Sequence, residues 1–184
     1  ARARSHGGAQ RRSAARTLME ALRFASLGLR PRLPLILQTE AAECGLACLA
    51  MIASYHGHRV DLAALRRRFP TSLRGVTLAA LIDLAAQIDL ASRAVRVELE
   101  QLAALRRPCI LHWRFEHFVV LERVNGRSLR LHDPALGRRT VSLAESSAAF
   151  TGAALQLWPT AAFRTRSTAA PVRLRSVLGR IDGL

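Results

Sequence analysis

The sequence contains no lysine, few aromatic residues, only three cysteines and no long apolar run. All 28 basic side chains are therefore arginines, and against 13 acidic side chains they give a net charge of +15. Without lysine, the chain cannot form a phosphate-binding loop of the G-x-x-x-x-G-K type. No apolar stretch approaches the roughly 18–20 residues that a membrane-spanning helix needs, so we expect a soluble chain.

The small and odd number of cysteines limits the redox and metal chemistry that we expect. No secretory signal with an apolar core and a cleavage site precedes them, so we predict no disulfide framework and a reducing compartment. Cys44 and Cys48 form a C-x-x-x-C pair, but no second pair of ligands follows at finger-like spacing. We therefore predict no metal site. The arginines are scattered and rarely interleaved with aromatic residues, which argues against a nucleic-acid partner.

Composition divides the 184 residues into three parts. Residues 1–32 form a basic arm rich in Arg, Ala and Gly, which we expect to be disordered. Residues 33–160 carry regular apolar patterns and have a suitable length for one compact domain. Residues 161–184 form an Arg-rich tail.

The central part begins with helical patterns and continues with strand patterns. Apolar residues at helical spacing predict helices over 44–55, 61–68 and 77–88, the second of them capped by Asp61. Further short helices are predicted over 100–105 and 142–150. Alternating or wholly apolar runs predict strands, which are 95–97, 109–113, 116–124, 128–132 and 153–158. Helices followed by antiparallel strands indicate an α+β domain.

The strongest candidate for chemistry is Cys44, which lies where a loop enters the first helix. Backbone N–H groups and the helix dipole favour an anion there, and a thiolate is a strong nucleophile for acyl transfer. Gln38, six residues earlier, could join the backbone N–H of Cys44 in binding a developing oxyanion. Cys48 and Cys109 lie in apolar surroundings and are interpreted as core residues.

A thiolate nucleophile requires a base, and His117 is the best of six histidines because an acid can reach its ring. The strands that carry His117 and Asp133 are joined by a short turn. In that arrangement Asp133 accepts the ring N–H and fixes the orientation of the imidazole. The alternative is that Asp133, followed by Pro134, only opens a turn.

The loop of this hairpin decides whether the two side chains can meet. A two-residue turn of Asn125 and Gly126 would place His117 and Asp133 on opposite faces. A three-residue loop over 124–126 places them directly opposite each other, with Gly126 in the left-handed conformation that this loop prefers. We therefore predict the three-residue loop.

Three segments together resemble one known family. They are a cysteine motif at 38–49 (QTEAAECGLACL), a histidine motif at 117–121 (HFVVL) and an aspartate motif at 132–137 (HDPALG). In this order they resemble the motifs of the double-glycine leader peptidases, which are the N-terminal peptidase domains of bacteriocin-exporting ABC transporters. The similarity runs through residues 33–160, including R-G-x-T at 74–77 and the F-T-G to W-P ending at 150–159.

The resemblance implies a papain-like cysteine protease fold with four site residues. Cys44 would be the nucleophile, His117 the base, Asp133 the residue that orients the base, and Gln38 a donor in the oxyanion hole. It also implies cleavage directly after a Gly-Gly or Gly-Ala pair that ends the leader of a precursor peptide. No cofactor is implied for the peptidase domain.

The transporters of this family continue into transmembrane helices and an ATP-binding domain. Our hypothesis is that the chain is the N-terminal part of such an exporter, which would be dimeric and would place this domain at the cytoplasmic face of the bacterial inner membrane. The Arg-rich tail suits a cytoplasmic segment before a first membrane helix. ATP and Mg²⁺ are expected only for the ATP-binding domain.

Two other functions are compatible with the same fold. Some exporters carry a similar domain that has lost its cysteine and only docks the leader, and the presence of Cys44 argues against that function here. A papain-like domain can also hydrolyse another amide or transfer an acyl group. Only the substrate distinguishes that activity from leader cleavage.

Overall fold

The computed structural model describes residues 31–69 and 75–165. The chain divides into two units, residues 1–32 and residues 33–184, and only the second is considered below. Most of the expected arm and tail therefore lies outside the described residues, and the three-part division stays a prediction. Within the two described ranges, no helix is long and apolar enough to cross a membrane.

Helices come first in this unit and strands follow, with two short helices between the later strands. In chain order the described elements are η1 (Ala41–Glu43), α2 (Cys44–Tyr55), α3 (Leu62–Arg68), α4 (Leu78–Gln87), β1 (Leu90–Arg96), η2 (Leu99–Ala104), β2 (Cys109–Trp113), β3 (His117–Asn125), β4 (Ser128–Asp133), β5 (Gly137–Ser142), α5 (Leu143–Ser147) and β6 (Phe150–Pro159). The η elements are 3-10 helices. The predicted α+β class is confirmed.

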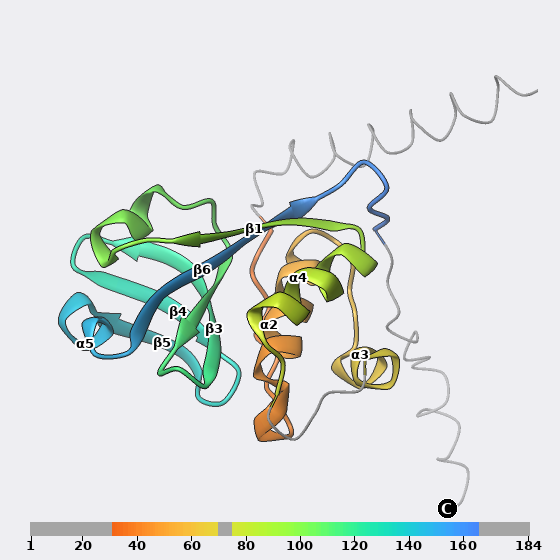
Figure 1. Cartoon of the computed structure of the whole chain (residues 1–184), viewed down its shortest axis with the longest axis horizontal. Coiled ribbons are helices and arrows are strands. Elements are labelled where there is room, and N and C mark those ends of the chain that lie inside the picture. Colours follow the sequence, from red (N-terminus) through yellow and green to blue (C-terminus); the bar gives the residue numbers. More distant parts are fainter. Residues whose placement is uncertain (1–30, 70–74, 166–184) are drawn as a thin grey trace, which may run out of the picture. The chain divides into compact units, whose positions relative to one another are not determined.

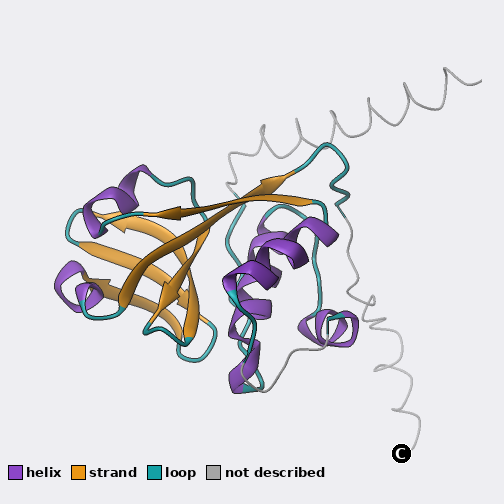
Figure 2. Ribbon diagram, viewed as in Figure 1, coloured by secondary structure: helices purple, strands orange, loops and turns teal. Residues whose placement is uncertain are grey.

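The strands form one antiparallel sheet in the order β1-β6-β2-β3-β4-β5. Strand β6, the last of the described strands, lies between β1 and β2 and pairs with both. The three helices α2, α3 and α4 gather beside the sheet, and the long β1–β6 pair reaches over them (Figure 1). Figure 2 shows the same division into a helical half and a sheet half.

Both faces of the central strands are buried, since successive strand residues point to opposite sides. In β2, Ile110 belongs to the core that includes α2. Its neighbours Cys109 and Leu111 belong to a second core on the other face of the sheet. The same alternation holds in β3, where Phe118 joins the first core and Val119 the second. Two cores on one sheet fix the registers of its strands.

Local signals explain where the helices begin, and the three predicted helices are confirmed. Asp61 caps α3 by accepting a hydrogen bond from the backbone N–H of Ala63, and Thr77 caps α4 in the same way through Ala80. Helix α2 contains Gly45 directly after Cys44. A Cβ atom there would collide with the Val76 side chain, so glycine permits the close approach of the segment before α4.

Three sequence predictions about the strand region need correction. Strand β5 was not predicted, because Val141 is its only buried residue and the segment shows no apolar alternation. Strand β1 starts at Leu90, several residues before the predicted 95–97 segment. Helix α5 is shorter than predicted since Phe150 already belongs to β6, where it pairs with Trp113.

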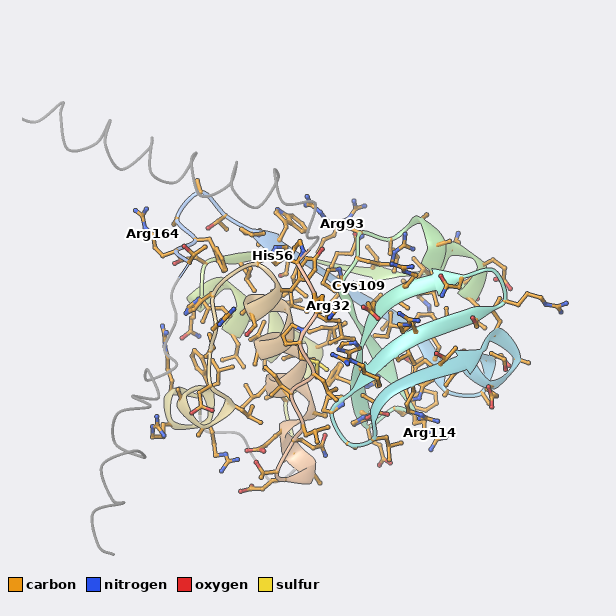
Figure 3. The ribbon with its side chains drawn as sticks, turned by 180° about the vertical axis from the view of Figure 1, so that it is seen from behind. Arg32, His56, Arg93, Cys109, Arg114 and Arg164 are labelled. Atoms are coloured by element: carbon orange, nitrogen blue, oxygen red, sulfur yellow. The ribbon has the colours of Figure 1, made fainter. Side chains whose placement is uncertain are left out.

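The arginines are spread over the fold rather than gathered along one element. Figure 3 shows Arg93, Arg114 and Arg164 at well-separated places. They come from β1, from the turn after β2 and from the segment after β6. The absence of a nucleic-acid partner stays a prediction.

Candidate active site

A cleft of about 540 Å³ lies at the N-terminal end of α2. Several separate parts of the chain line it, namely the segment before α2, the start of α2, the segment before α4, the turn between β2 and β3 with its flanking residues, the end of β4 with the turn after it, and β5. The lining residues with reactive or hydrogen-bonding side chains include Gln38, Cys44, Glu116, His117 and Asp133. All four site residues that the sequence predicted therefore line one cleft.

Cys44 is the first residue of α2 and is 4% exposed, yet its side chain lines the cleft. It is close enough to the His117 ring to help raise the pKa of that imidazole. At the N-terminus of a helix, the aligned peptide dipoles favour a negative charge. The thiol thus lies at the N-terminus of a helix and near an imidazole, which is the arrangement expected of a nucleophilic cysteine.

His117 is the first residue of β3 and lies between Cys44 and Asp133. Its Nε2 donates a hydrogen bond of 2.9 Å to Oδ1 of Asp133. That bond occupies Nε2 and leaves Nδ1 as the ring nitrogen available to Cys44. A ring held from both sides has a fixed orientation, as a general acid or base requires.

Asp133 ends β4 and is buried. Besides the His117 ring, its Oδ1 accepts hydrogen bonds from the backbone N–H groups of Ala135 at 2.9 Å and Leu136 at 3.3 Å. Its other oxygen lies 3.6 Å from the Arg139 guanidinium. Asp133 therefore organises the turn that follows β4 and contacts the imidazole at the same time, and its role in catalysis stays a prediction.

The predicted three-residue hairpin loop is wrong, although the two side chains do meet. Asn125 pairs with Ser128, so the turn consists of Gly126 and Arg127. Gly126 has φ 52°, the left-handed conformation that a two-residue turn of this kind requires at its first position. This register alone would place His117 and Asp133 on opposite faces.

A β-bulge in β3 reverses that outcome. Leu121 pairs with Leu131 and Arg123 with Arg130, so Glu122 is an extra residue without a partner opposite it. The extra residue shifts the register by one, which returns His117 and Asp133 to the same face of the sheet. The bulge therefore brings the two side chains within hydrogen-bonding distance.

Gln38 is tied to the site through its backbone. Its N–H donates a hydrogen bond of 2.9 Å to the carbonyl of Pro134, directly after Asp133. Four residues earlier, the carbonyl of Pro34 accepts a bond of 3.1 Å from Nδ1 of His132. The segment before α2 is thus attached to the end of β4. Among the described residues, the buried amide oxygen of Gln38 has no hydrogen-bond partner.

The electrostatics of the site favour a charged imidazole. Burial by itself lowers the pKa of His117, but the hydrogen bonds to Asp133 and Cys44 and the charges of these partners outweigh it and raise the pKa to about 9. Burial by itself raises the pKa of Asp133, but the bonds from His117 and Ala135 outweigh it and lower the pKa. At neutral pH, Asp133 is therefore ionised and His117 protonated.

The other two cysteines and His112 are not candidates for the nucleophile or the base. Burial raises the pKa of Cys48 well above its usual range and that of Cys109 to about 12, so neither is a ready nucleophile. His112 is hydrogen-bonded to Thr151 at 2.9 Å and does not line the cleft. In the parts of the chain that the structure describes, no three His, Cys, Asp or Glu side chains gather in a way that could hold a metal ion.

Sequence reasoning missed two arginines that contact a site residue or the direct neighbour of one. Arg139 lies beside Asp133, and Arg66 on α3 pairs with Glu43, the neighbour of Cys44. Both are members of Arg-rich segments, and no signal in the sequence separates them from the other arginines. Only the fold shows which guanidinium reaches a buried carboxylate.

Comparison with known proteins gives a family for this arrangement. The family model described as the peptidase C39 family matches residues 32–162. The colicin V secretion/processing ATP-binding protein CvaB of Escherichia coli is 46% identical over 169 residues, which cover 92% of this chain and 24% of the relative. The probable microcin-H47 secretion/processing ATP-binding protein MchF of Escherichia coli is 48% identical over 155 residues, or 84% and 22% of the two chains. The chain thus spans about a quarter of these relatives.

Solved structures show the same fold. A double glycine motif protease from an AMS/PCAT transporter, in complex with the leader peptide, matches with a TM-score of 0.67 and 36% identity, over 71% of this chain and 94% of that one. The peptidase domain of Streptococcus ComA, a bifunctional ABC transporter, matches with a TM-score of 0.65 and 25% identity, over 70% and 100% of the two chains. The papain-like fold expected from the sequence is confirmed.

Proposed function

The chain belongs to the peptidase C39 family, and from this premise we propose that it is a cysteine endopeptidase that removes double-glycine leaders from precursor peptides of the bacteriocin and microcin type. The observation that carries the proposal is that Cys44, His117 and Asp133 line one cleft, with His117 hydrogen-bonded to Asp133 at 2.9 Å. The similarity to a leader-bound double-glycine protease and to two bacteriocin-processing proteins supports the choice of substrate.

In the proposed reaction Cys44 attacks as a thiolate while His117 holds the proton. The sulfur bonds to the carbonyl carbon of the last leader glycine, and negative charge develops on the carbonyl oxygen. His117 then gives its proton to the amine of the departing mature peptide, which leaves the leader bound as a thioester. A water molecule, deprotonated by His117, attacks the thioester and releases the leader with Cys44 as a free thiol.

Asp133 keeps the His117 ring in the orientation that both proton transfers need. Its bonds to Ala135 and Leu136 fix the carboxylate, and the carboxylate in turn fixes the ring. Its negative charge also stabilises the imidazolium form. We therefore propose a Cys-His-Asp triad in which Asp133 contributes orientation and charge but does not exchange protons itself.

The pH dependence of the reaction should reveal the imidazolium. Since the pKa of His117 is raised to about 9, the protonated form prevails below that pH and is lost above it. We expect kcat/KM to fall as the pH rises through about 9. Asp133 is one of the causes of the raised pKa, so in Asp133→Asn the fall should begin at lower pH.

Glu116 offers a matched control for this pH profile, because Glu116→Gln removes one negative charge from the same cleft. The groups that raise the pKa of His117 are Asp133 and Cys44, so the pH at which kcat/KM falls should stay close to the parent's in Glu116→Gln. If kcat/KM of Asp133→Asn fell at the same pH as that of the parent, a group other than His117 would control the loss of activity at high pH.

Gln38 is proposed to stabilise the oxyanion together with the backbone N–H of Cys44. Its side chain lines the cleft, and the bond from its N–H to Pro134 holds it beside the triad. Gln38→Ala should reduce kcat by roughly tenfold to a thousandfold, the range for removing one oxyanion donor. Gln38→Glu keeps the size but lacks the amide donor and should be similarly slow. A kcat in Gln38→Ala equal to the parent's would exclude this role.

The function itself is tested with a synthetic precursor whose leader ends in Gly-Gly. The 184-residue chain should cut this peptide once, directly after the second glycine, and mass spectrometry of both products locates the cut. A matched peptide with valine in place of the second glycine should stay intact, because the proposed specificity requires small residues beside the cut. No cleavage of the Gly-Gly peptide, with cleavage of another amide, would favour the amidase or acyltransferase alternative.

The remaining parts of the proposal concern the whole protein. Because the relatives are about four times longer than this chain, we propose that it is the peptidase part of an ABC exporter. Its partners would be the precursor peptide and the transmembrane and ATP-binding domains of the same, dimeric transporter. That placement puts the peptidase at the cytoplasmic face of the inner membrane, with ATP and Mg²⁺ needed only by the ATP-binding domain.

A further inference from the structure

Glu43 is a buried carboxylate directly before Cys44 in the sequence, with a relative exposure of 1%. One of its oxygens accepts three hydrogen bonds. They come from the backbone N–H of Thr39 at 2.9 Å, the hydroxyl of Thr39 at 3.0 Å and the backbone N–H of Glu40 at 3.1 Å. The carboxylate therefore closes the segment Thr39–Glu43 into a tight loop.

Arg66 brings a positive charge to this loop from α3. Its Nε forms an ion pair with Glu43, and its Nη2 donates a hydrogen bond of 2.7 Å to the hydroxyl of Thr39. Its Nη1 lies 3.7 Å from the Glu40 carboxylate. One guanidinium thus contacts three side chains of the loop, as its planar, forked geometry permits.

The loop Thr39–Glu43 connects two of the proposed site residues. Gln38 precedes it and Cys44 follows it, so Thr39–Glu43 sets the distance between the proposed oxyanion donor and the nucleophile. We propose that Arg66 is a positioning residue that fixes this loop and neutralises Glu43 beside the nucleophile. The inference rests on the proposed function for its catalytic meaning, but its effect on Cys44 can be measured without any peptide substrate.

The charge of Glu43 follows from its surroundings. Burial by itself raises the pKa of this carboxyl, but the hydrogen bonds from Thr39, Arg66 and Glu40 outweigh it and lower the pKa. Glu43 is therefore ionised at neutral pH, and in the chain it directly precedes the residue that must also become negative. A second negative charge nearby disfavours the thiolate, and the guanidinium of Arg66 cancels that effect.

Other charged groups face Cys44 from the elements packed around it. The cleft that Cys44 lines also contains the charged or titratable side chains of Arg114, Glu116, His117, Asp133 and Arg139. Cys48, one turn further along α2, has a pKa that burial raises well above its usual range and stays neutral. None of these groups changes in variants of Glu43 and Arg66, so a shift in thiol reactivity reports on that pair.

A purely structural ion pair makes a different prediction from a pair that serves the nucleophile. Breaking a buried pair destabilises a protein whichever partner is removed, and both losses lower its melting temperature. A charge effect on Cys44 has opposite signs for the two partners. Removing Arg66 leaves an extra negative charge beside the thiol, whereas removing the charge of Glu43 leaves an extra positive one.

The test measures how fast iodoacetamide alkylates Cys44 as a function of pH, with the Cys44 peptide followed by mass spectrometry. Arg66→Met should shift the alkylation curve to higher pH and slow alkylation at neutral pH about tenfold. Glu43→Gln, which keeps an oxygen acceptor for Thr39 and Glu40, should shift the curve to lower pH. The double variant Glu43→Gln/Arg66→Met should return close to the parent curve because no uncompensated charge remains.

Arg67→Met is the matched control, since Arg67 is the exposed neighbour of Arg66 on α3. It removes the same charge from the same helix and should leave the curve unchanged. Curves for Arg66→Met and Glu43→Gln that coincide with the parent's, or that shift in the same direction, would overturn the proposal. If Arg66→Met does not fold, Glu43→Gln alone decides. An alkylation curve of Glu43→Gln that stays at the parent's position or moves to higher pH contradicts the proposed role.

The same variants separate this inference from the proposed function. In a cleavage assay Arg66→Met should lower kcat much more than it raises KM, because the loop sets the geometry of the reacting groups rather than substrate affinity. If the parent cuts no double-glycine precursor, the proposed function fails. The opposite shifts of the alkylation curves would still show that Arg66 and Glu43 control the thiol.

Discussion

Replacing Cys44 by alanine should abolish cleavage of a double-glycine precursor while leaving its binding intact. The sulfur is the atom that forms the thioester, and neither His117 nor Gln38 can replace it. We expect the loss in kcat to be on the order of 10⁴-fold or more, as for other enzymes that lose a covalent nucleophile. Single-turnover cleavage gives the rate, and fluorescence anisotropy of a labelled precursor gives the affinity.

Cys48→Ala is the matched control for this loss. Cys48 lies one helical turn from Cys44 on α2, but it is fully buried in the core and does not line the cleft. Its variant should cleave at close to the parent's rate after correction for any unfolded fraction. Equal cleavage by Cys44→Ala and the parent would exclude Cys44 as the nucleophile. Activity lost only in Cys48→Ala would assign the nucleophile to Cys48 instead.

Replacing His117 by alanine should be nearly as severe. The imidazole both stabilises the thiolate and delivers the proton to the leaving amine, so its removal affects both steps of thioester formation. We expect kcat to fall on the order of 10³- to 10⁴-fold. Asp133→Ala should cost less, because the carboxylate orients the ring and stabilises its charge without exchanging protons. Stopped assays with mass detection cover this range of rates.

His112→Gln is the control for His117→Ala. His112 lies on the neighbouring strand β2, and its Nδ1 is bonded to Thr151 rather than to Cys44. Glutamine can keep a bond to the threonine hydroxyl, so this variant should fold and cleave like the parent. If His112→Gln lost more activity than His117→Ala, the assignment of the base would be wrong.

The helical half of the fold could be predicted from sequence because its signals are local. The apolar spacing of α2, the caps at Asp61 and Thr77, and Gly57, whose φ of 96° is left-handed just after α2 ends, act within a few residues. The site could be predicted in part for a similar reason. Cys44 at a helix start and Asp133 before a proline are local features. The resemblance of three motifs to one family supplied the roles expected of them.

The hairpin shows where sequence reasoning failed. The pairing of His117 with Asp133 was predicted from a three-residue loop, whereas the structure uses a two-residue turn and a bulge at Glu122. The bulge leaves no clear mark on the sequence, because Glu122 and Arg123 are polar residues that suit either face of a partly exposed strand end. The meeting of the two side chains was foreseen, but for the wrong geometric reason.

The Glu43–Arg66 pair could not have been predicted at all. The two residues belong to different helical elements, and their contact depends on how α3 packs beside α2. Nothing in the sequence distinguishes Arg66 from Arg67 and Arg68. The fold makes one of the three the partner of a buried carboxylate and leaves its neighbour Arg67 exposed, which is why Arg67 can serve as a control.

The central claim is that Cys44 is a thiolate nucleophile directed at the last leader glycine, and one covalent probe tests it directly. A leader peptide whose terminal Gly-Gly carries a chloromethyl ketone presents an electrophilic carbon to the nucleophile. We predict a single adduct, located on Cys44 by peptide mapping, that forms much more slowly in His117→Ala. An adduct on Cys48 or Cys109, or no adduct in a preparation that still cuts the precursor, would contradict the account.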